Sequence, residues 1–238
     1  MTAPANPRRR IDLIDALRGL AVVLMVMHHF AYDLVVYAGA PVWLFTNPVI
    51  DIFHYIFAGL FIFLSGVSSR FSRSNIKRGL KVLIAALVIS IVTHLPIIDA
   101  PIVFGILHLL SFCMLFYGLT RRLWDKIPRA IAPILYVALI AGSAIAVSFP
   151  LKGTGLWLFG WVQEGFFSAD YFPLFPWLFV FLLGTWAGAF VAEGRLPEWF
   201  YTFTMPFFPA VGRKSFLVYL IHQPILFGLV QLGLLLFG

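Results

Sequence analysis

The sequence predicts an all-α fold: a polytopic transmembrane helix bundle of about seven spans that forms one integral membrane domain over residues 1–238. Three observations predict it, namely the composition, the length of the apolar segments and the distribution of Lys and Arg. Hydrophobic residues make up 61% of the 238 residues and charged residues 11%, whereas soluble domains have roughly 45–50% and 25%. The chain is therefore too apolar for a soluble protein.

Apolar segments long enough to cross a bilayer follow one another along the chain. A crossing helix needs about 20 such residues. Residues 1–10 form a basic tail without a signal-peptide cleavage site, so we expect the first helix to be retained. The seven predicted helices cover residues 13–36, 48–69, 79–98, 102–120, 131–149, 172–192 and 215–236.

Lys and Arg are concentrated in alternate connections of the predicted bundle. They precede the first helix and lie between the second and third, the fourth and fifth, and the sixth and seventh helices. Of the 17 basic residues, 15 lie in or at the edges of these connections, Lys152 lies on the other side and Arg18 lies in the membrane. The positive-inside rule then places the N-terminus in the cytoplasm and the C-terminus outside. The same bias explains the net charge of +7, so we expect no nucleic-acid partner.

The first predicted helix carries four ionisable side chains on one face: Asp15, Arg18, His29 and Asp33. Charged groups inside a membrane are costly and usually face a bundle interior or a watery cavity, where they mark function. Because His29 and Asp33 are one helical turn apart, the carboxylate can accept the imidazole N–H and leave the other nitrogen as a general base. The alternative is that Asp33 is a helix-end charge and His29 only bonds a neighbouring helix. The alignment of His29 with Arg18 favours the functional interpretation.

Further titratable groups are expected in the same outer half of the membrane. Asp51 and His54 lie near the outer end of the second helix, and His108 lies about two turns below the outer surface in the fourth. If these helices face the first, the groups share one site with His29. His54 and His108 are then either partners of the catalytic pair or structural residues. The single cysteine, Cys113, excludes a Cys metal cluster.

Two connections and the last helix carry additional features. Residues 152–171 are rich in aromatic residues and glycine, and residues 196–213 contain three prolines. Each is either an interfacial anchor or a lid over the bundle.

Arg213 and Lys214 begin the last helix. A helix N-terminus with two cations can bind an anion, although the positive-inside rule predicts these cations without a ligand. His222 and Gln223 precede Pro224, which is expected to kink the helix beside polar side chains.

Several of these motifs occur together in a known order. They are Asp15-Ala16-Leu17-Arg18-Gly19, His29 four residues before Asp33, FIFLSG at 61–66, FGILH at 104–108, DYFPLFPW at 170–177, GRKS at 212–215 and YLIHQP at 219–224. The set resembles a bacterial family of integral membrane proteins similar to the catalytic domain of heparan-alpha-glucosaminide N-acetyltransferase, within the transmembrane acyltransferase superfamily. Since this chain has fewer spans than enzymes of that superfamily, either the core is minimal or a homo-oligomer completes it.

The resemblance implies transfer of an acyl group, typically acetyl, from cytosolic acetyl-CoA or another acyl-CoA to a sugar or glycan acceptor at a bacterial inner membrane. It implies an intramembrane histidine, here His29, as general base or transient acyl carrier, with Asp33 orienting it and Arg18 facing the donor. The basic loops, including Arg78, Arg213 and Lys214, would meet the CoA phosphates. No metal is expected.

Two other classes of protein stay open. A transporter or channel would use the same Arg, His and Asp groups inside the membrane, although no inverted repeat is visible. A zinc-dependent membrane hydrolase would use His29, Asp33, His54 and His108 as metal ligands. Binding of acyl-CoA and the metal content of the purified protein separate these classes from an acyltransferase.

Overall fold

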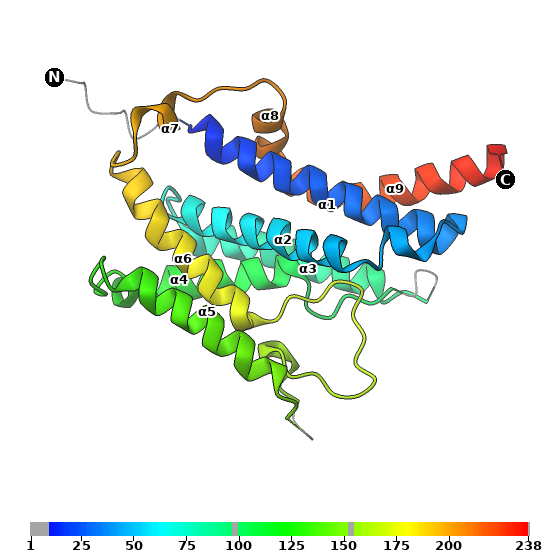
Figure 1. Cartoon of the computed structure of the whole chain (residues 1–238), viewed down its shortest axis with the longest axis horizontal. Helices are drawn as coiled ribbons and strands as arrows, with labels where there is room; N and C mark the ends of the chain where they lie inside the picture. Colours follow the sequence, from blue (N-terminus) through cyan, green and yellow to red (C-terminus); the bar gives the residue numbers. More distant parts are fainter. Residues whose placement is uncertain (1–9, 97–99, 152–154, 238) are drawn as a thin grey trace. The chain divides into compact units, whose positions relative to one another are not determined.

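The computed structural model describes residues 10–96, 100–151 and 155–237 (Figure 1). Over these residues the fold is helical, and the β-structure consists of one isolated bridge between Phe104 and Tyr171. The all-α prediction is thereby confirmed. The α-helices are α1 Asp12–Ala38, α2 Pro48–Ser69, α3 Asn75–Thr93, α4 Ile106–Trp124, α5 Ala132–Ser148, α6 Leu174–Ala192, α7 Glu198–Thr202, α8 Phe208–Arg213 and α9 Ser215–Phe237, with short 3₁₀ helices η1 Val42–Leu44 and η2 Trp157–Phe159.

Five helical segments in the described part of the chain are long and apolar enough to cross a membrane. They are α1, Val42–Ser69 (η1 with α2), α4, α6 and α9. The other two predicted spans meet the criteria only in part. Helix α5 is apolar but has 17 residues, and α3 carries Lys77, Arg78 and Lys81 in its first two turns.

The helix boundaries agree with the prediction to within two residues except in the third and fourth helices, where α3 begins earlier than expected, at Asn75, and α4 ends later, at Trp124. The third helix was expected to reach residue 98 but ends at Thr93, where His94 caps it. The fourth was expected from residue 102, yet α4 begins at Ile106. The chain before it is extended instead, because Phe104 pairs with Tyr171 and the amide of Phe172 donates to the carbonyl of Phe104 at 2.9 Å.

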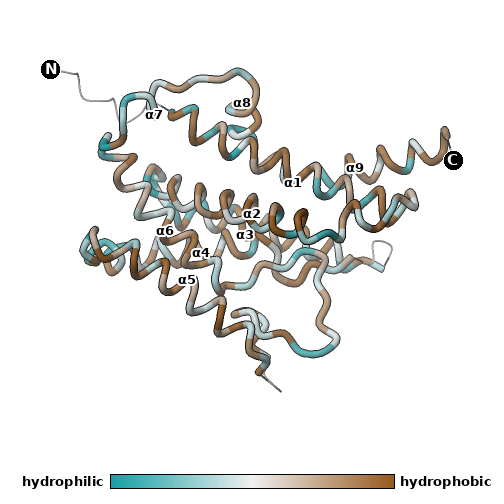
Figure 2. Tube along the Cα trace, in the orientation of Figure 1, coloured by the Kyte–Doolittle hydropathy of each residue, from teal (hydrophilic) through white to brown (hydrophobic). Residues whose placement is uncertain are grey.

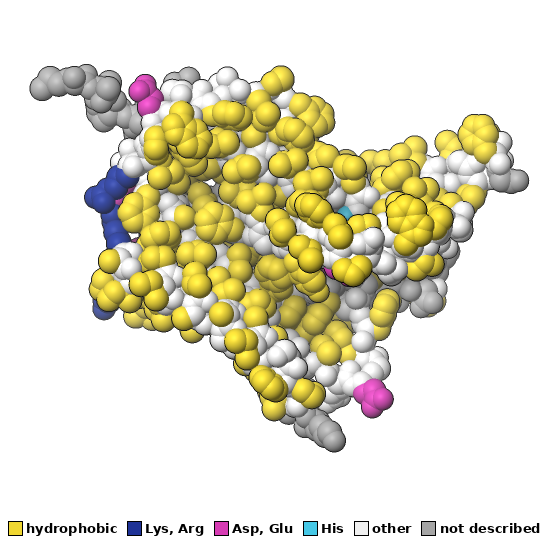
Figure 3. All heavy atoms as spheres, in the orientation of Figure 1, with side chains coloured by type: hydrophobic (Ala, Val, Ile, Leu, Met, Phe, Trp, Pro, Cys, Tyr) yellow, Lys and Arg dark blue, Asp and Glu magenta, His cyan; other side chains and the backbone are white. Residues whose placement is uncertain are grey.

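Apolar side chains point outward along the long helices. Figure 2 shows hydrophobic residues along most of each helix, and Figure 3 shows hydrophobic side chains over most of the visible face, with Lys and Arg at its left edge. Ile91, Leu119 and Ile134 are 68%, 74% and 71% exposed. Such surfaces are expected for helices that face lipid, because lipid tails do not penalise exposed apolar groups as water does.

The chain divides into two compact units. Unit 1 consists of the described residues up to Leu64 and from Leu196 onward, and unit 2 of those from Ser65 to Arg195. The single-domain organisation expected from the sequence stays a prediction.

In unit 1, helices α8 and α9 pack on α1, and Figure 1 shows α8 lying beside α1. The contact with α8 depends on two glycines. A Cβ atom on Gly19 would lie 2.0 Å from the carbonyl oxygen of Phe208, and one on Gly212 would lie 1.8 Å from that of Asp15. Segment 196–213 therefore includes a short helix that is held directly against α1.

In unit 2, α3 packs on α4 and α5 on α6. The FIFLSG segment serves close helix packing, because a Cβ on Gly66 would lie 2.1 Å from the carbonyl oxygen of Phe181 on α6.

The segment before α6 is attached to the start of α4. The amide of Ile106 donates to Oδ2 of Asp170 at 3.0 Å, and the amide of Val103 donates to Oγ of Ser168 at 3.1 Å. Residues 155–171 thus fold back onto the beginning of α4.

Candidate active site

Helices α1 and α9 bring four polar side chains together in unit 1: His29, Asp33, His222 and Gln223. The amide nitrogen of Gln223 donates to Oδ1 of Asp33 at 2.8 Å. The rings of His29 and His222 meet edge to face, with centroids 4.9 Å apart and an interplanar angle of 74°. Asp33 is completely buried and His222 is 8% exposed. A polar cluster is thus built between two largely apolar helices.

The backbone fixes the tautomers of both histidines. Nδ1 of His29 lies 2.9 Å from the carbonyl oxygen of Met25, and Nδ1 of His222 lies 2.7 Å from that of Tyr219. Because a carbonyl oxygen only accepts hydrogen bonds, Nδ1 carries the hydrogen in each ring. In a neutral imidazole, Nε2 then has a free lone pair and can take a proton.

The same bonds differ from the pairing expected within α1. The imidazole N–H of His29 was expected to bind Asp33, but it binds the carbonyl of Met25, one turn earlier. Asp33 instead accepts from Gln223, 190 residues away in the sequence. The physical reason is that the backbone carbonyl of Met25 lies within reach of the His29 ring one turn back, whereas the carboxylate has a partner on the neighbouring helix.

Three buried polar atoms of this cluster have no hydrogen-bond partner among the described residues. They are Oδ2 of Asp33, Nε2 of His222 and Oε1 of Gln223. Leaving a buried polar atom unpaired costs about 1–3 kcal/mol, so such atoms are rare outside sites that bind water or a ligand. In the tautomer that the backbone selects, all three are acceptors. The cluster therefore suits a bound molecule that donates hydrogen bonds, such as one with hydroxyl or amine groups.

His54 lies next to this cluster but against a different histidine. Its ring centroid is 4.4 Å from that of His28, and His28 in turn packs on Phe45 at 4.8 Å. The rings of His28 and His29 are 6.0 Å apart. The structure thus brings His54 and His29 into one row of histidines through His28, a residue that lies off the polar face of α1.

His108 belongs to unit 2, where the fold uses both of its ring nitrogens. Nδ1 accepts from the amide of Gly105 at 3.2 Å, and Nε2 lies 3.2 Å from Oγ of Ser90. The hydroxyl of Ser90 donates to the carbonyl of Ile102 at 2.6 Å, so its oxygen accepts from Nε2. These bonds hold the start of α4 in place. Of the two roles expected for His108, catalytic partner or structural residue, they favour the structural one.

The basic residues expected to bind the donor lie in both units. In unit 1, Arg18 forms an ion pair with Asp15 at 2.7 Å and its side chain is 17% exposed. Arg213 lies 3.5 Å from Asp12, and Lys214 is exposed at the end of α8. These three cations therefore gather where α8 packs on the beginning of α1. Arg78 is half-buried on α3 in unit 2.

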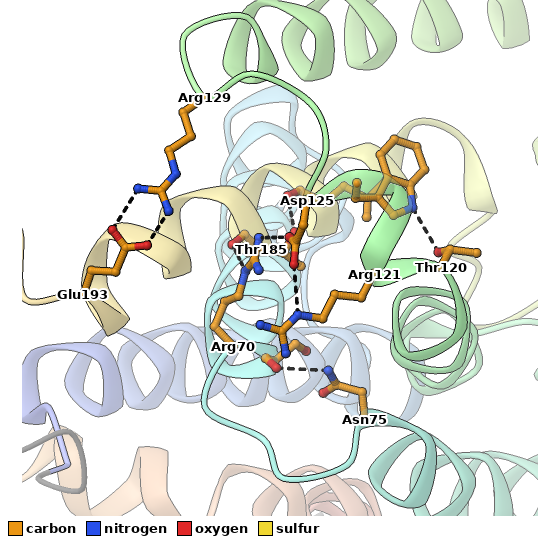
Figure 4. Close-up of polar contacts among 11 residues, drawn as sticks. Arg70, Asn75, Thr120, Arg121, Asp125, Arg129, Thr185 and Glu193 are labelled. Carbon is orange, nitrogen blue, oxygen red and sulfur yellow. Dashed lines mark hydrogen bonds and ion pairs between the residues drawn. The ribbon is translucent and has the colours of Figure 1, made fainter.

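An ion-pair network that the sequence did not predict joins the ends of α2 and α4 to α6 in unit 2 (Figure 4). Arg70, at the end of α2, donates from Nε to the carbonyl of Thr185 at 2.7 Å and pairs with Asp125 at 2.7 Å. Arg121 adds a second contact to Asp125 at 3.1 Å. Burial alone would raise the pKa of Asp125, but the hydrogen bonds and charges of Arg70 and Arg121 hold it below its usual value.

A second part of the network lies at the end of α6. Arg129 pairs with both carboxylate oxygens of Glu193, and Arg195 lies 2.9 Å from the same group. The hydrogen bond from Arg129 holds the pKa of Glu193 below its usual value. The basic connections after α2, α4 and α6 thus meet at one end of unit 2 and are partly neutralised there.

Within residues 10–96, 100–151 and 155–237, no three His, Cys, Asp or Glu side chains come together as a group that could hold a metal ion. His29, Asp33, His54 and His108, the ligands considered for zinc, are engaged instead with the separate partners described above.

His222 and Gln223 are the two site residues that sequence reasoning noted but did not assign to the reaction. They were identified only as polar neighbours of Pro224. A histidine and a glutamine adjacent to each other in an otherwise apolar span are costly in lipid, so they usually mark a functional site. This cost was the signal in the sequence that could have assigned them to the site. The position of the pair opposite His29 and Asp33 could not be read from the sequence, because it depends on how α9 packs on α1.

The comparisons with known proteins identify one family. A family model described as "Heparan-alpha-glucosaminide N-acetyltransferase, catalytic" matches residues 10–224, a range that contains all four residues of the cluster. Neither curated proteins nor solved structures gave a match. The chain belongs to the family of the heparan-alpha-glucosaminide N-acetyltransferase catalytic domain.

Proposed function

We propose that this protein is a membrane-embedded acyltransferase. It moves an acyl group, in the first place acetyl, from cytosolic acyl-CoA to a hydroxyl or amine of a sugar or glycan acceptor. The family supports acetyl transfer. The observation that carries the proposal for this chain is the facing pair of His29 and His222, two imidazoles beside a buried carboxylate in a membrane helix pair.

The proposed topology has seven spans in a bacterial cytoplasmic membrane, with the N-terminus inside and the C-terminus outside. Five of these spans are the segments that are long and apolar enough to cross a membrane, and α3 and α5 are the other two. The positive-inside rule supports this orientation. The ion-pair network also supports it, because it gathers three of the basic connections at one end of unit 2.

In this topology His29 is the central residue of the reaction. It lies 17 residues beyond the start of α1, which corresponds to about 25 Å of helix, so the acceptor reaches it from the outer half of the membrane. His29 acts as general base or as transient acyl carrier through Nε2. Asp33, held by Gln223, provides the negative charge next to it, and His54 supports the row of histidines through His28.

The donor enters from the cytoplasmic end of α1. Arg213 and Lys214 are exposed there, and they suit the phosphates of CoA because phosphate groups form charge-assisted hydrogen bonds with cations. Arg18 lies next to them and extends the positive region into the membrane, while Arg78 is the corresponding candidate in unit 2. Arg18 and His29 are 11 residues apart, or about 16 Å along the helix, which is comparable with an extended pantetheine arm.

Binding of acetyl-CoA to the purified chain in detergent tests this function. At about 100 times its dissociation constant, a ligand adds roughly 2.7 kcal/mol to the free energy of unfolding, so acetyl-CoA should raise the unfolding temperature. The double variant Arg213→Gln/Lys214→Gln should lose this shift at the same concentration. Lys126→Gln, which removes an exposed cation in the connection after α4, is the matched control and should keep it.

The alternatives predict different results in the same assay. A chain that neither binds acetyl-CoA nor transfers its acyl group contradicts the proposal. Stabilisation by a transported solute alone identifies a transporter, and stoichiometric zinc that is lost on substitution of His29 identifies a metal-dependent hydrolase.

A further inference from the structure

His222 is held in one orientation by its own helix. Its Nδ1–H donates to the carbonyl of Tyr219 at 2.7 Å, and its ring packs against those of His29 and Tyr219 at centroid distances of 4.9 and 5.5 Å. The side chain is 8% exposed. Nε2, the nitrogen with the free lone pair, has no hydrogen-bond partner in the part of the chain that the structure describes. A buried base without a partner is thus fixed beside His29.

Gln223 holds the carboxylate of Asp33 in place. Its Nε2 donates to Oδ1 of Asp33 at 2.8 Å, which leaves Oε1 of Gln223 and Oδ2 of Asp33 as unpartnered acceptors within the described residues. A carboxylate near an imidazole stabilises the imidazolium that forms when the ring takes a proton. Gln223 is therefore a positioning residue for Asp33.

We propose that His222 is a second catalytic histidine, the base that takes the proton of the acceptor through Nε2, while His29 contacts the acyl group. This assignment rests on the proposed acyltransferase function. Nothing else in the described part of unit 1 combines a fixed tautomer, burial and an unpartnered nitrogen lone pair so close to His29. His28 and His54 are engaged with each other instead.

The reaction balances with this assignment. The O–H or N–H bond of the acceptor breaks, its proton goes to Nε2 of His222, and the acceptor atom forms a bond to the acyl carbon. The C–S bond of the thioester breaks, and the thiolate takes the proton from His222, so that CoA leaves as the thiol. In a two-step transfer, Nε2 of His29 first forms a bond to the acyl carbon as the C–S bond breaks, and the departing thiolate takes a proton from water. The acceptor atom then forms its bond to the acyl carbon as the C–N bond to His29 breaks, and the acceptor's proton passes through Nε2 of His222 to water.

The substitution His222→Asn separates this role from a structural one. The amide nitrogen of Asn reproduces Nδ1 and can still donate to the carbonyl of Tyr219, but no atom replaces Nε2. We expect the variant to keep its unfolding temperature and to transfer the acyl group about 100-fold more slowly or worse, because a general base contributes about 10²–10⁴-fold. The smaller variant His222→Ala should recover part of the rate when imidazole is added.

His94→Asn is the matched control. Nδ1 of His94 makes the same type of bond, 2.7 Å to the carbonyl of Ser90, but the residue is exposed at the end of α3. It should transfer at the rate of the unmodified chain. If His222→Asn also transfers at that rate, the inference is overturned while the acyltransferase function stands. If the unmodified chain neither binds nor transfers the acyl group, the function itself fails and the inference fails with it.

Discussion

The amide of Gln223 on α9 donates a hydrogen bond of 2.8 Å to Oδ1 of Asp33 on α1. The bond joins two helices that lie at opposite ends of the sequence, and it partners a carboxylate that is completely buried. Burial of an ionised group is costly unless it is hydrogen-bonded, so the bond matters both for the packing of α9 on α1 and for the charge beside His29.

Replacing Gln223 by Leu should therefore destabilise unit 1. Hydrogen bonds to charged groups contribute about 1.5–3 kcal/mol, and the substitution should lower the free energy of unfolding by a similar amount. Denaturation of the purified chain in detergent measures this change. Gln231→Leu, at an exposed position of the same helix, is the control. Equal stabilities for the two variants would show that the bond contributes nothing.

Asp33→Asn should reduce acyl transfer less than the loss of either histidine. The Asn side chain can still accept from Gln223, but it has no negative charge to stabilise an imidazolium. Initial rates of CoA release compare the variants under saturating acetyl-CoA. An Asp33→Asn rate equal to that of the unmodified chain would show that the charge of Asp33 does not contribute to the reaction.

The packing of α8 on α1 predicts that Gly212→Ala disrupts the donor region. A Cβ at this position would lie 1.8 Å from the carbonyl oxygen of Asp15, and backbone atoms cannot move aside as a flexible side chain can. The variant should lower the unfolding temperature and weaken acetyl-CoA binding, since Arg213 and Lys214 follow directly.

Gly228→Ala provides the control for this packing. Its Cβ has no neighbour within 4 Å among the described residues, and Ala favours a helix by up to about 1 kcal/mol relative to Gly. We expect unchanged or slightly higher stability. If Gly212→Ala behaved in the same way, α8 would not be packed on α1 as described.

The network around Asp125 predicts a dependence of stability on pH. The pKa of this carboxyl is lowered from 3.8 in the folded chain, so its ion pairs stabilise unit 2 fully above that pH. The contribution is lost as the pH falls further, through the folded-state pKa. Between about pH 6 and about pH 3, Asp125→Asn should flatten the fall in unfolding temperature. Curves of equal steepness for the two proteins would contradict the role given to Arg70 and Arg121.

The sequence predicted the helical class and most helix boundaries, because apolar length is a local property that lipid imposes on each span. It failed at the start of α4, where residues 101–105 are extended because segment 168–172 pairs with them. Such pairing between distant segments has no local signal in the sequence. The contacts of Arg70 with Asp125 and Thr185 were not predicted, because they too join segments that are distant in the sequence.

For the candidate site, the polar face of α1 was visible in the sequence but its partners were not. Helical periodicity placed His29 and Asp33 on one face, but it does not predict the hydrogen-bond partner of either side chain. The carbonyl of Met25 binds the imidazole, and Gln223 of α9 binds the carboxylate. His222 was recognisable only as a polar residue in lipid, and its place beside His29 depends on tertiary packing.

Release of CoA from acetyl-CoA by the unmodified chain and by His29→Asn, in the presence of membrane glycans, tests whether His29 carries out acyl transfer. The Asn side chain keeps the bond to the carbonyl of Met25 but lacks Nε2, so the fold should persist. We expect the unmodified chain to release CoA and the variant to be slower by about 100-fold or more. Equal rates for the two proteins would contradict the role of His29, and no release by either would contradict the acyltransferase function.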